Sequence, residues 1–164
     1  MQLNFYETNN KQYLYDSHLH PEYLDKELLH EYDPIESSWF TPFMNFVNDN
    51  LNKYNVNKNT ATVLGASTGR VVFDLVKSFQ QVIGVDYCGK FLEVALQLQS
   101  KGRLEFTLET DKNKSLKLDI SDNMNASNAV FKQMTWIPNE IPKSDLVLFT
   151  MIDRVTNELR KFIS

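Results

Sequence analysis

A short glycine-containing turn is the part of this sequence whose residue types and spacing are best suited to chemistry. The segment Gly65-Ala66-Ser67-Thr68-Gly69 follows a β-branched run, Thr60–Leu64, and precedes a helical pattern over Arg70–Phe79. Small residues in a strand-to-helix turn let the backbone approach a ligand, and the first turn of a helix offers N–H groups without intrahelical partners. This layout predicts a site for a nucleotide-type cofactor.

A carboxylate that would complete such a site, Asp86, ends the next predicted strand, Gln81–Asp86. A carboxylate at that strand tip can accept hydrogen bonds from both hydroxyls of a ribose. A dinucleotide site favours G-x-G-x-x-G, in which the first and third glycines are five residues apart. Here Gly65 and Gly69 are four residues apart, with Ser67 between them. An NAD(P)-dependent oxidoreductase is therefore an alternative that Asp86 favours and the glycine spacing disfavours.

Strands that alternate with helices are expected to position these residues. The pattern predicts an α/β protein with a Rossmann-like doubly wound parallel sheet and an incomplete second half. We expect one domain, in which a helical lead-in (residues 1–58) packs on a core (residues 59–164). No element is predicted over the polar stretch Asp111–Asn128. The expected helices are Gln12–Tyr15, Glu22–Leu29, Ser38–Leu51, Arg70–Phe79, Lys90–Ser100 and the stretch from Asp153; the expected strands are Thr60–Leu64, Gln81–Asp86, Leu104–Leu108, Ala129–Met134 and Asp145–Thr150.

Composition narrows the class of protein. The 164 residues are 42% hydrophobic, which is enough for a packed core, and carry a net charge of −4 without any long basic cluster. Nucleic-acid binding normally needs a basic face, so we expect no nucleic-acid partner. The single cysteine, Cys88, cannot form an internal disulfide, and neither a signal peptide nor a membrane helix is indicated. These features predict a cytoplasmic protein.

The segments around the turn resemble class I S-adenosylmethionine-dependent methyltransferases. The resemblance rests on Val63–Arg70, on Phe73-Asp74-Leu75 and on Gly84-Val85-Asp86-Tyr87 followed by Phe91-Leu92. More narrowly, the chain is similar to the methyltransferase domain of ovothiol biosynthesis, the 4-mercaptohistidine N1-methyltransferases. The segments that carry this narrower similarity are the Gly-x-x-x-Gly-Arg turn, Trp136–Glu140, Ile152-Asp153-Arg154, Tyr6-Glu7-Thr8 and Tyr13-Leu14.

The resemblance implies an enzyme with S-adenosylmethionine as its cofactor and a small thiohistidine-like acceptor. Its implied cofactor contacts are Gly65, Ala66, Ser67 and Gly69 around methionine and ribose, Asp86 on the ribose, Tyr87 on adenine, and Thr135 and Trp136 in the adenine pocket. Simpler interpretations stay open for several of these residues. The glycines suit any tight turn, Asp86 suits a helix cap, and Trp136 suits core packing.

The chain departs from the family pattern at three points. Val63 stands where the family has an acidic residue two positions before the first glycine, and Thr135 stands near the acidic residue expected after the third strand. The family has about seven strands, whereas the parallel strands predicted here end at residue 150. An apolar edge strand would then need covering, so we expect a second copy or a missing segment over it. A truncated or degenerate relative that binds the cofactor without turnover is the resulting alternative.

The sequence does not identify a catalytic base. Tyr6, Glu7, Tyr13 and Asp153 are candidates by position only, and Arg70 is interpreted as a solvated residue. His18, His20, Glu22 and His30 suggest a metal, but two histidines at i and i+2 point to opposite sides of a helix, so no metal site is expected. Cys88 has no CxxC partner or neighbouring histidine and is not expected to be a catalytic thiol.

Overall fold

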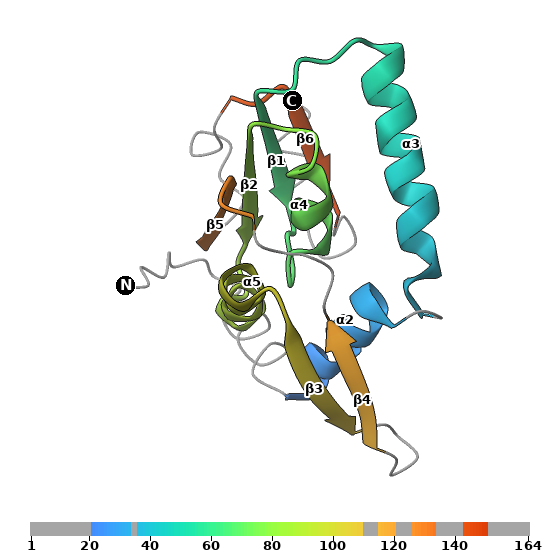
Figure 1. The fold of residues 1–164 in the computed structure, drawn as a ribbon, viewed down its shortest axis with the longest axis vertical. Coiled ribbons are helices and arrows are strands. Elements are labelled where there is room, and N and C mark those ends of the chain that lie inside the picture. The colour runs from blue at the N-terminus through green and yellow to red at the C-terminus, as the bar shows by residue number, and fades with distance from the viewer. Residues whose placement is uncertain (1–20, 34–35, 110–114, 121–125, 134–142, 151–164) are drawn as a thin grey trace, which may run out of the picture.

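The computed structural model describes residues 21–33, 36–109, 115–120, 126–133 and 143–150 (Figure 1). Two predicted helices, Gln12–Tyr15 and the stretch from Asp153, lie outside these ranges. The helices are α2 (Pro21–Tyr32), the short 3-10 helix η1 (Glu36–Trp39), α3 (Phe40–Lys53), α4 (Arg70–Leu75) and α5 (Gly89–Lys101). The strands are β1 (Thr60–Leu64), β2 (Gln81–Asp86), β3 (Leu104–Glu109), β4 (Ser115–Ile120), β5 (Ala129–Gln133) and β6 (Leu146–Phe149).

Four of the strands form one parallel sheet in the order β5-β2-β1-β6. The chain builds outward from β1 through β2 to β5, and then returns to add β6 on the other side of β1. The winding direction therefore reverses between β1 and β6, which confirms the predicted α/β, Rossmann-like, doubly wound class. Ligands bind open α/β sheets at such a reversal, outside the carboxyl ends of the strands.

Burial on both faces explains why β1 and β2 read as short apolar runs. Residues 61 to 64 of β1 are at most 1% exposed, as expected for central parallel strands. On one face Ala61 and Val63 share a large core with Met44 and Val47 of α3. On the other face Leu64, Ile83 and Val85 pack with Phe149 of β6.

The predicted helix Arg70–Phe79 is shorter in the structure, where α4 ends at Leu75. Tighter turns follow, in which Lys77 N bonds Asp74 O at 3.2 Å and Ser78 N bonds Leu75 O at 2.9 Å. The apolar spacing continues through these turns because they still pack on the core, so periodicity alone overestimated the helix. Similarly, the start of the predicted helix Ser38–Leu51 belongs to η1 rather than to α3.

A second, two-stranded sheet was only half predicted. The strand expected at Leu104–Leu108 is β3, and it pairs antiparallel with β4, which lies where no element was expected. The register runs from Leu104 opposite Ile120 to Glu109 opposite Ser115. Figure 1 shows this hairpin, with α2 beside it, on the side toward which the carboxyl ends of β1 and β2 point. Among the described helices, none combines the length and apolar character required to cross a membrane.

Candidate functional site

The turn after β1 has an unusual backbone. Gly65, Ser67 and Gly69 all have positive φ angles, of 84°, 48° and 99°. Ser67 is the notable member, because residues with a Cβ atom seldom adopt this left-handed conformation and do so most often in turns and at functional sites. The amides of Gly65 and Ala66 both donate to the carbonyl of Val85, at 2.8 and 2.9 Å, so the turn crosses directly over the end of β2.

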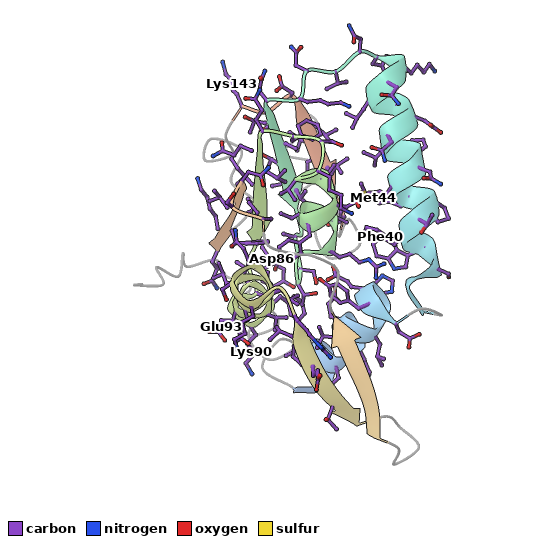
Figure 2. All side chains as sticks on the ribbon, in the orientation of Figure 1. Phe40, Met44, Asp86, Lys90, Glu93 and Lys143 are labelled. Atoms are coloured by element: carbon purple, nitrogen blue, oxygen red, sulfur yellow. The ribbon has the colours of Figure 1, made fainter. Side chains whose placement is uncertain are left out.

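The Asp86 side chain lies against this turn. Its Oδ2 accepts the backbone N–H of Ser67 at 2.8 Å, and its Oδ1 accepts the N–H of Cys88 at 2.8 Å. The residue is only 2% exposed and lies at the end of β2, near the start of α5 (Figure 2). The structure therefore brings together the glycine turn and the carboxylate that the sequence predicted as partners. The helix-cap interpretation of Asp86 is not confirmed, because the N-cap of α5 is Cys88 and no side chain caps that helix. Asp86 Oδ1 instead accepts the backbone N–H of this N-cap residue.

Helix α2 covers the same turn with two glutamates that the sequence analysis did not identify. Ser67 Oγ donates to Glu27 Oε1 at 2.7 Å, and Thr68 Oγ1 donates to Glu31 Oε2. Tyr32 Oη adds a third bond, to the Thr68 carbonyl at 3.2 Å. Glu27 and Glu31 are four residues apart and therefore share one face of the helix. Each is 5% exposed, and Ser67 and Thr68 are 1% and 0% exposed.

Burial gives the Glu31 carboxyl group an altered affinity for protons. Desolvation, followed by the charge of Glu27, raises the pKa of Glu31 to about 8, and Asp86 adds to this rise. The Thr68 hydroxyl and the Arg70 guanidinium act in the opposite direction. Glu31 is therefore largely protonated at neutral pH, and one of its oxygens can carry the proton while Oε2 accepts from Thr68.

Arg70 connects the helices around the turn. Its guanidinium lies over the ring of Phe40 at 4.2 Å and over the ring of Tyr32 at 5.4 Å. These cation–π contacts join α4 to α3 and α2, which corrects the interpretation of Arg70 as a merely solvated residue. The same guanidinium is the cation that offsets the charge near Glu31.

A further polar group lies at the end of β5, beside the turn into α5. Gln133 Nε2 donates to the Tyr87 carbonyl at 2.8 Å, which fixes the orientation of the amide. Its Oε1 is buried and has no hydrogen-bond partner among the described residues. The adjacent Gly89 leaves room for this amide, because a Cβ there would lie 3.2 Å from Gln133 Nε2. Sequence reasoning missed Gln133, although its place at a strand end next to Asp86 was a usable signal.

Several predicted residues lie outside the described part of the chain, and their roles stay predictions. These are Thr135, Trp136, Tyr6, Glu7, Tyr13, Asp153, His18 and His20. His30 stacks on Trp39, with ring centroids 5.1 Å apart. Within the described ranges, no three His, Cys, Asp or Glu side chains are grouped closely enough to hold a metal ion. Cys88 is buried beside Asp86, and Val63 is buried in the core, where it offers no polar contact.

Comparison with known proteins gives a fold-level likeness. No protein-family model and no curated protein matches the chain. Among solved structures, it is similar to phosphoethanolamine N-methyltransferase 1 of Haemonchus contortus, crystallised with phosphoethanolamine and S-adenosylhomocysteine, at 14% identity and a TM-score of 0.39. That match covers 57% of this chain and 16% of the other.

Two further structures extend the comparison. A precorrin 8W decarboxylase from Methanobacterium thermoautotrophicum has 18% identity and a TM-score of 0.43 over 66% of this chain and 49% of the other. The DhpI–S-adenosylhomocysteine complex has 15% identity and a TM-score of 0.37 over 77% and 52%. This chain thus spans at most about half of each of these proteins. The likeness to methyltransferases is distant and partial.

Proposed function

We propose that this chain binds S-adenosylmethionine at the Gly65–Gly69 turn and belongs to an N-methyltransferase for a small thiohistidine-like acceptor. The observation that carries the proposal is the 2.8 Å bond from the Ser67 amide to Asp86 Oδ2. It places a carboxylate and a glycine turn together at the carboxyl ends of β1 and β2, where sheets of this topology bind ligands. The acceptor is inferred from the sequence resemblance to 4-mercaptohistidine N1-methyltransferases.

In the bound state, each polar group at this edge has a task that suits its chemistry. Asp86 would accept the ribose hydroxyls, and the left-handed backbone at Ser67 would let the ligand approach the main chain. Gln133 Oε1, the acceptor without a described partner, would take a hydrogen bond from the amino group of the purine. Tyr87 and the predicted contacts Thr135 and Trp136 would complete the adenine pocket.

The charge around the turn favours a sulfonium cofactor over a dinucleotide. Glu27 and Asp86 are buried beside it, and Glu31 is largely neutral at pH 7, so a pyrophosphate would meet carboxyl groups, whereas a cation would not be repelled. A dinucleotide also needs a helix N-terminus for its pyrophosphate, and α4 has only six residues. An NAD(P)-dependent oxidoreductase is therefore the weaker alternative.

Methyl transfer itself requires alignment more than covalent chemistry. The bound cofactor would supply the methyl group, which the acceptor nitrogen would take in line as the S–CH3 bond breaks, leaving S-adenosylhomocysteine and a methylated ring whose proton passes to a base. A site contributes mainly by holding the two reactants in contact, and a nearby base accepts the ring proton. We assign no base, because the positional candidates lie outside the described residues.

Calorimetric titration of the purified chain tests the proposed cofactor. We expect binding of S-adenosylmethionine and S-adenosylhomocysteine, and no binding of NADH. Asp86→Asn should weaken binding of both ligands by about tenfold or more, because a hydrogen bond to a charged acceptor contributes roughly 1.5–3 kcal/mol. The control is Asp74→Asn, which alters only a surface pair with Lys77 at 2.7 Å. Binding of NADH, or no heat with millimolar S-adenosylmethionine, would refute the proposal.

Turnover is tested separately, in a single-turnover assay with methyl-labelled cofactor and 4-mercaptohistidine. Transfer of label to the imidazole supports the N-methyltransferase. Cofactor binding without transfer supports the alternative of a degenerate relative, which the loss of an acidic residue at Val63 motivates.

A further inference from the structure

The Gly65–Gly69 turn, the candidate cofactor site, is buried beneath other parts of the protein. Ser67 and Thr68 are at most 1% exposed, and Asp86 is 2% exposed with both carboxylate oxygens engaged by backbone amides. A ligand that reaches Asp86 must therefore displace what covers it. The cover includes α2, whose Glu27 and Glu31 hold the two hydroxyl groups of the turn.

All three polar contacts from α2 reach the turn from the C-terminal half of the helix. Glu27, Glu31 and Tyr32 bond Ser67 Oγ, Thr68 Oγ1 and the Thr68 carbonyl. The same helix is tied to η1 through Trp39 Nε1, which donates to the His30 carbonyl at 2.9 Å. Because the contacts to the turn come from a single helix, they can form and break together as α2 docks and releases.

We propose that α2 is a proton-controlled latch over the Ser67–Thr68 turn. When Glu31 is neutral, the helix docks onto the turn. When Glu31 is ionised, the helix is released and the site opens to its ligand. Protonated Glu31 can be buried against Thr68 at little electrostatic cost. Ionised Glu31 must either stay buried near Glu27 and Asp86 or move into water with its helix. The identity of the ligand rests on the proposed function, whereas the latch motion does not.

The groups that face Glu31 set the direction of its response to pH. Glu27 on α2 and Asp86 on β2 raise its pKa in addition to desolvation, whereas Arg70 on α4 and the Thr68 hydroxyl lower it. With α2 docked the pKa is about 8, and after release it returns toward the ordinary 4.5. The docked state therefore holds the extra proton, so docking is strongest below pH 4.5 and weakens progressively up to about pH 8.

Hydrogen exchange of the unliganded chain tests the latch without reference to any cofactor. After correction for intrinsic rates, amides of α2 and of residues 66–69 should exchange up to about a hundredfold faster at pH 9 than at pH 6. The pH range from 6 to the docked pKa of about 8 spans two pKa units, and each unit corresponds to a factor of ten. Glu31→Gln keeps a neutral acceptor for Thr68 and should show the same corrected rates at both pH values. The control Glu93→Gln, an exposed site on α5, should behave like wild type.

A second variant tests the coupling between the two glutamates. Glu27→Gln removes a charge that raises the Glu31 pKa, so the opening midpoint should move to lower pH. An unchanged midpoint, or a pH response in Glu31→Gln equal to that of wild type, would overturn the latch.

Ligand titration then separates the latch from the proposed function. Wild type should bind both S-adenosylmethionine and S-adenosylhomocysteine up to about a hundredfold more tightly at pH 9 than at pH 6, since two pKa units separate pH 6 from the docked pKa of about 8. Glu31→Gln should show no such change and serves as the reference. An effect confined to the cationic S-adenosylmethionine would indicate direct contact with Glu31 and would count against the latch. If exchange responds to pH but neither ligand binds, the latch stands and the proposed cofactor fails.

Discussion

Ser67 joins the strand, the helix cover and the candidate ligand site in one residue. Its backbone is left-handed at a φ of 48°, its amide donates to Asp86 and its hydroxyl donates to Glu27. Each contact depends on the others, because the backbone conformation aims the amide toward β2 while the side chain faces α2. The position thus couples closure of the site to the geometry of the turn.

Gly69 is the residue of the turn whose replacement should cost most. Its φ of 99° strains any residue with a Cβ, and such an atom would lie 2.7 Å from Phe73 Cε2 and 3.0 Å from Phe131 Cζ. We expect Gly69→Ala to lower the free energy of unfolding by about 2–4 kcal/mol, from left-handed strain plus overpacking. Urea unfolding monitored by circular dichroism measures this loss.

The matched control for this substitution is Gly102→Ala. Gly102 also has a positive φ, of 69°, but nothing lies within 4 Å of its added Cβ. Only the backbone strain of about 1–2 kcal/mol should remain. Equal losses of unfolding free energy at the two positions would show that the contacts with Phe73 and Phe131 do not contribute to the cost of Gly69→Ala.

The sequence could predict that the turn lies next to Asp86, but not that helix α2 covers the turn. Two consecutive parallel strands must end at the same edge, so Gly65–Gly69 and Asp86 were placed together by spacing alone. Glu27 lies 40 residues before Ser67, and no local pattern encodes a contact over that distance. On a helix, Glu27 and Glu31 read as a solvated face, and only the packed structure shows that they are buried.

At the scale of elements, α4 is held at its end by a side chain from a distant segment. Asn128 Nδ2 donates to the carbonyls of Val76 and Phe79, at 3.1 and 2.9 Å. These carbonyls follow the end of the helix and would otherwise lack donors. These two bonds, the Asn128 clamp, join the turns that follow α4 to the start of β5.

Removal of this clamp should destabilise the fold moderately. We expect Asn128→Ala to cost about 1–3 kcal/mol, because two part-buried carbonyls lose their donor. The exposed neighbour Ser127 provides the control, and Ser127→Ala should change stability by less than about 0.5 kcal/mol. Thermal and urea unfolding measure both variants, and similar values for the two would contradict the clamp.

Element types were more predictable than element ends. β1 and β2 have the predicted bounds, because buried β-branched runs leave few alternatives. The turns that follow α4 are bound by Asn128, 52 residues from Val76, and local sequence patterns do not encode a contact over that distance. For β4 the signal was present, since Leu116, Leu118 and Ile120 alternate with polar residues, but its polar surroundings obscured it.

At the scale of the whole molecule, the buried carboxyl group of Glu31 should make stability depend on pH. Its native pKa of about 8 exceeds the ordinary value of 4.5, so the native state binds the extra proton between these values. Stability from this group is complete below pH 4.5 and lost as pH rises through 8, by up to about 5 kcal/mol, and by less if α2 releases first.

Urea unfolding at pH 5, 7 and 9 checks this dependence. The difference in unfolding free energy between Glu31→Gln and wild type isolates Glu31 from the other titrating groups. We expect this difference to increase in favour of the variant as the pH rises. Parallel curves for the two proteins would mean that Glu31 titrates alike in the folded and unfolded chain.

The central position of β1 sets the order in which the sheet can be completed. Its first neighbour, β2, follows within about 21 residues, since Thr60 pairs with Gln81, but its second, β6, follows 85 residues later, since Ala61 pairs with Leu146. Pairings that close so long a loop form slowly. During synthesis, the β1 edge therefore emerges from the ribosome long before its second partner, and that half of the sheet is the part most in need of protection by a chaperone.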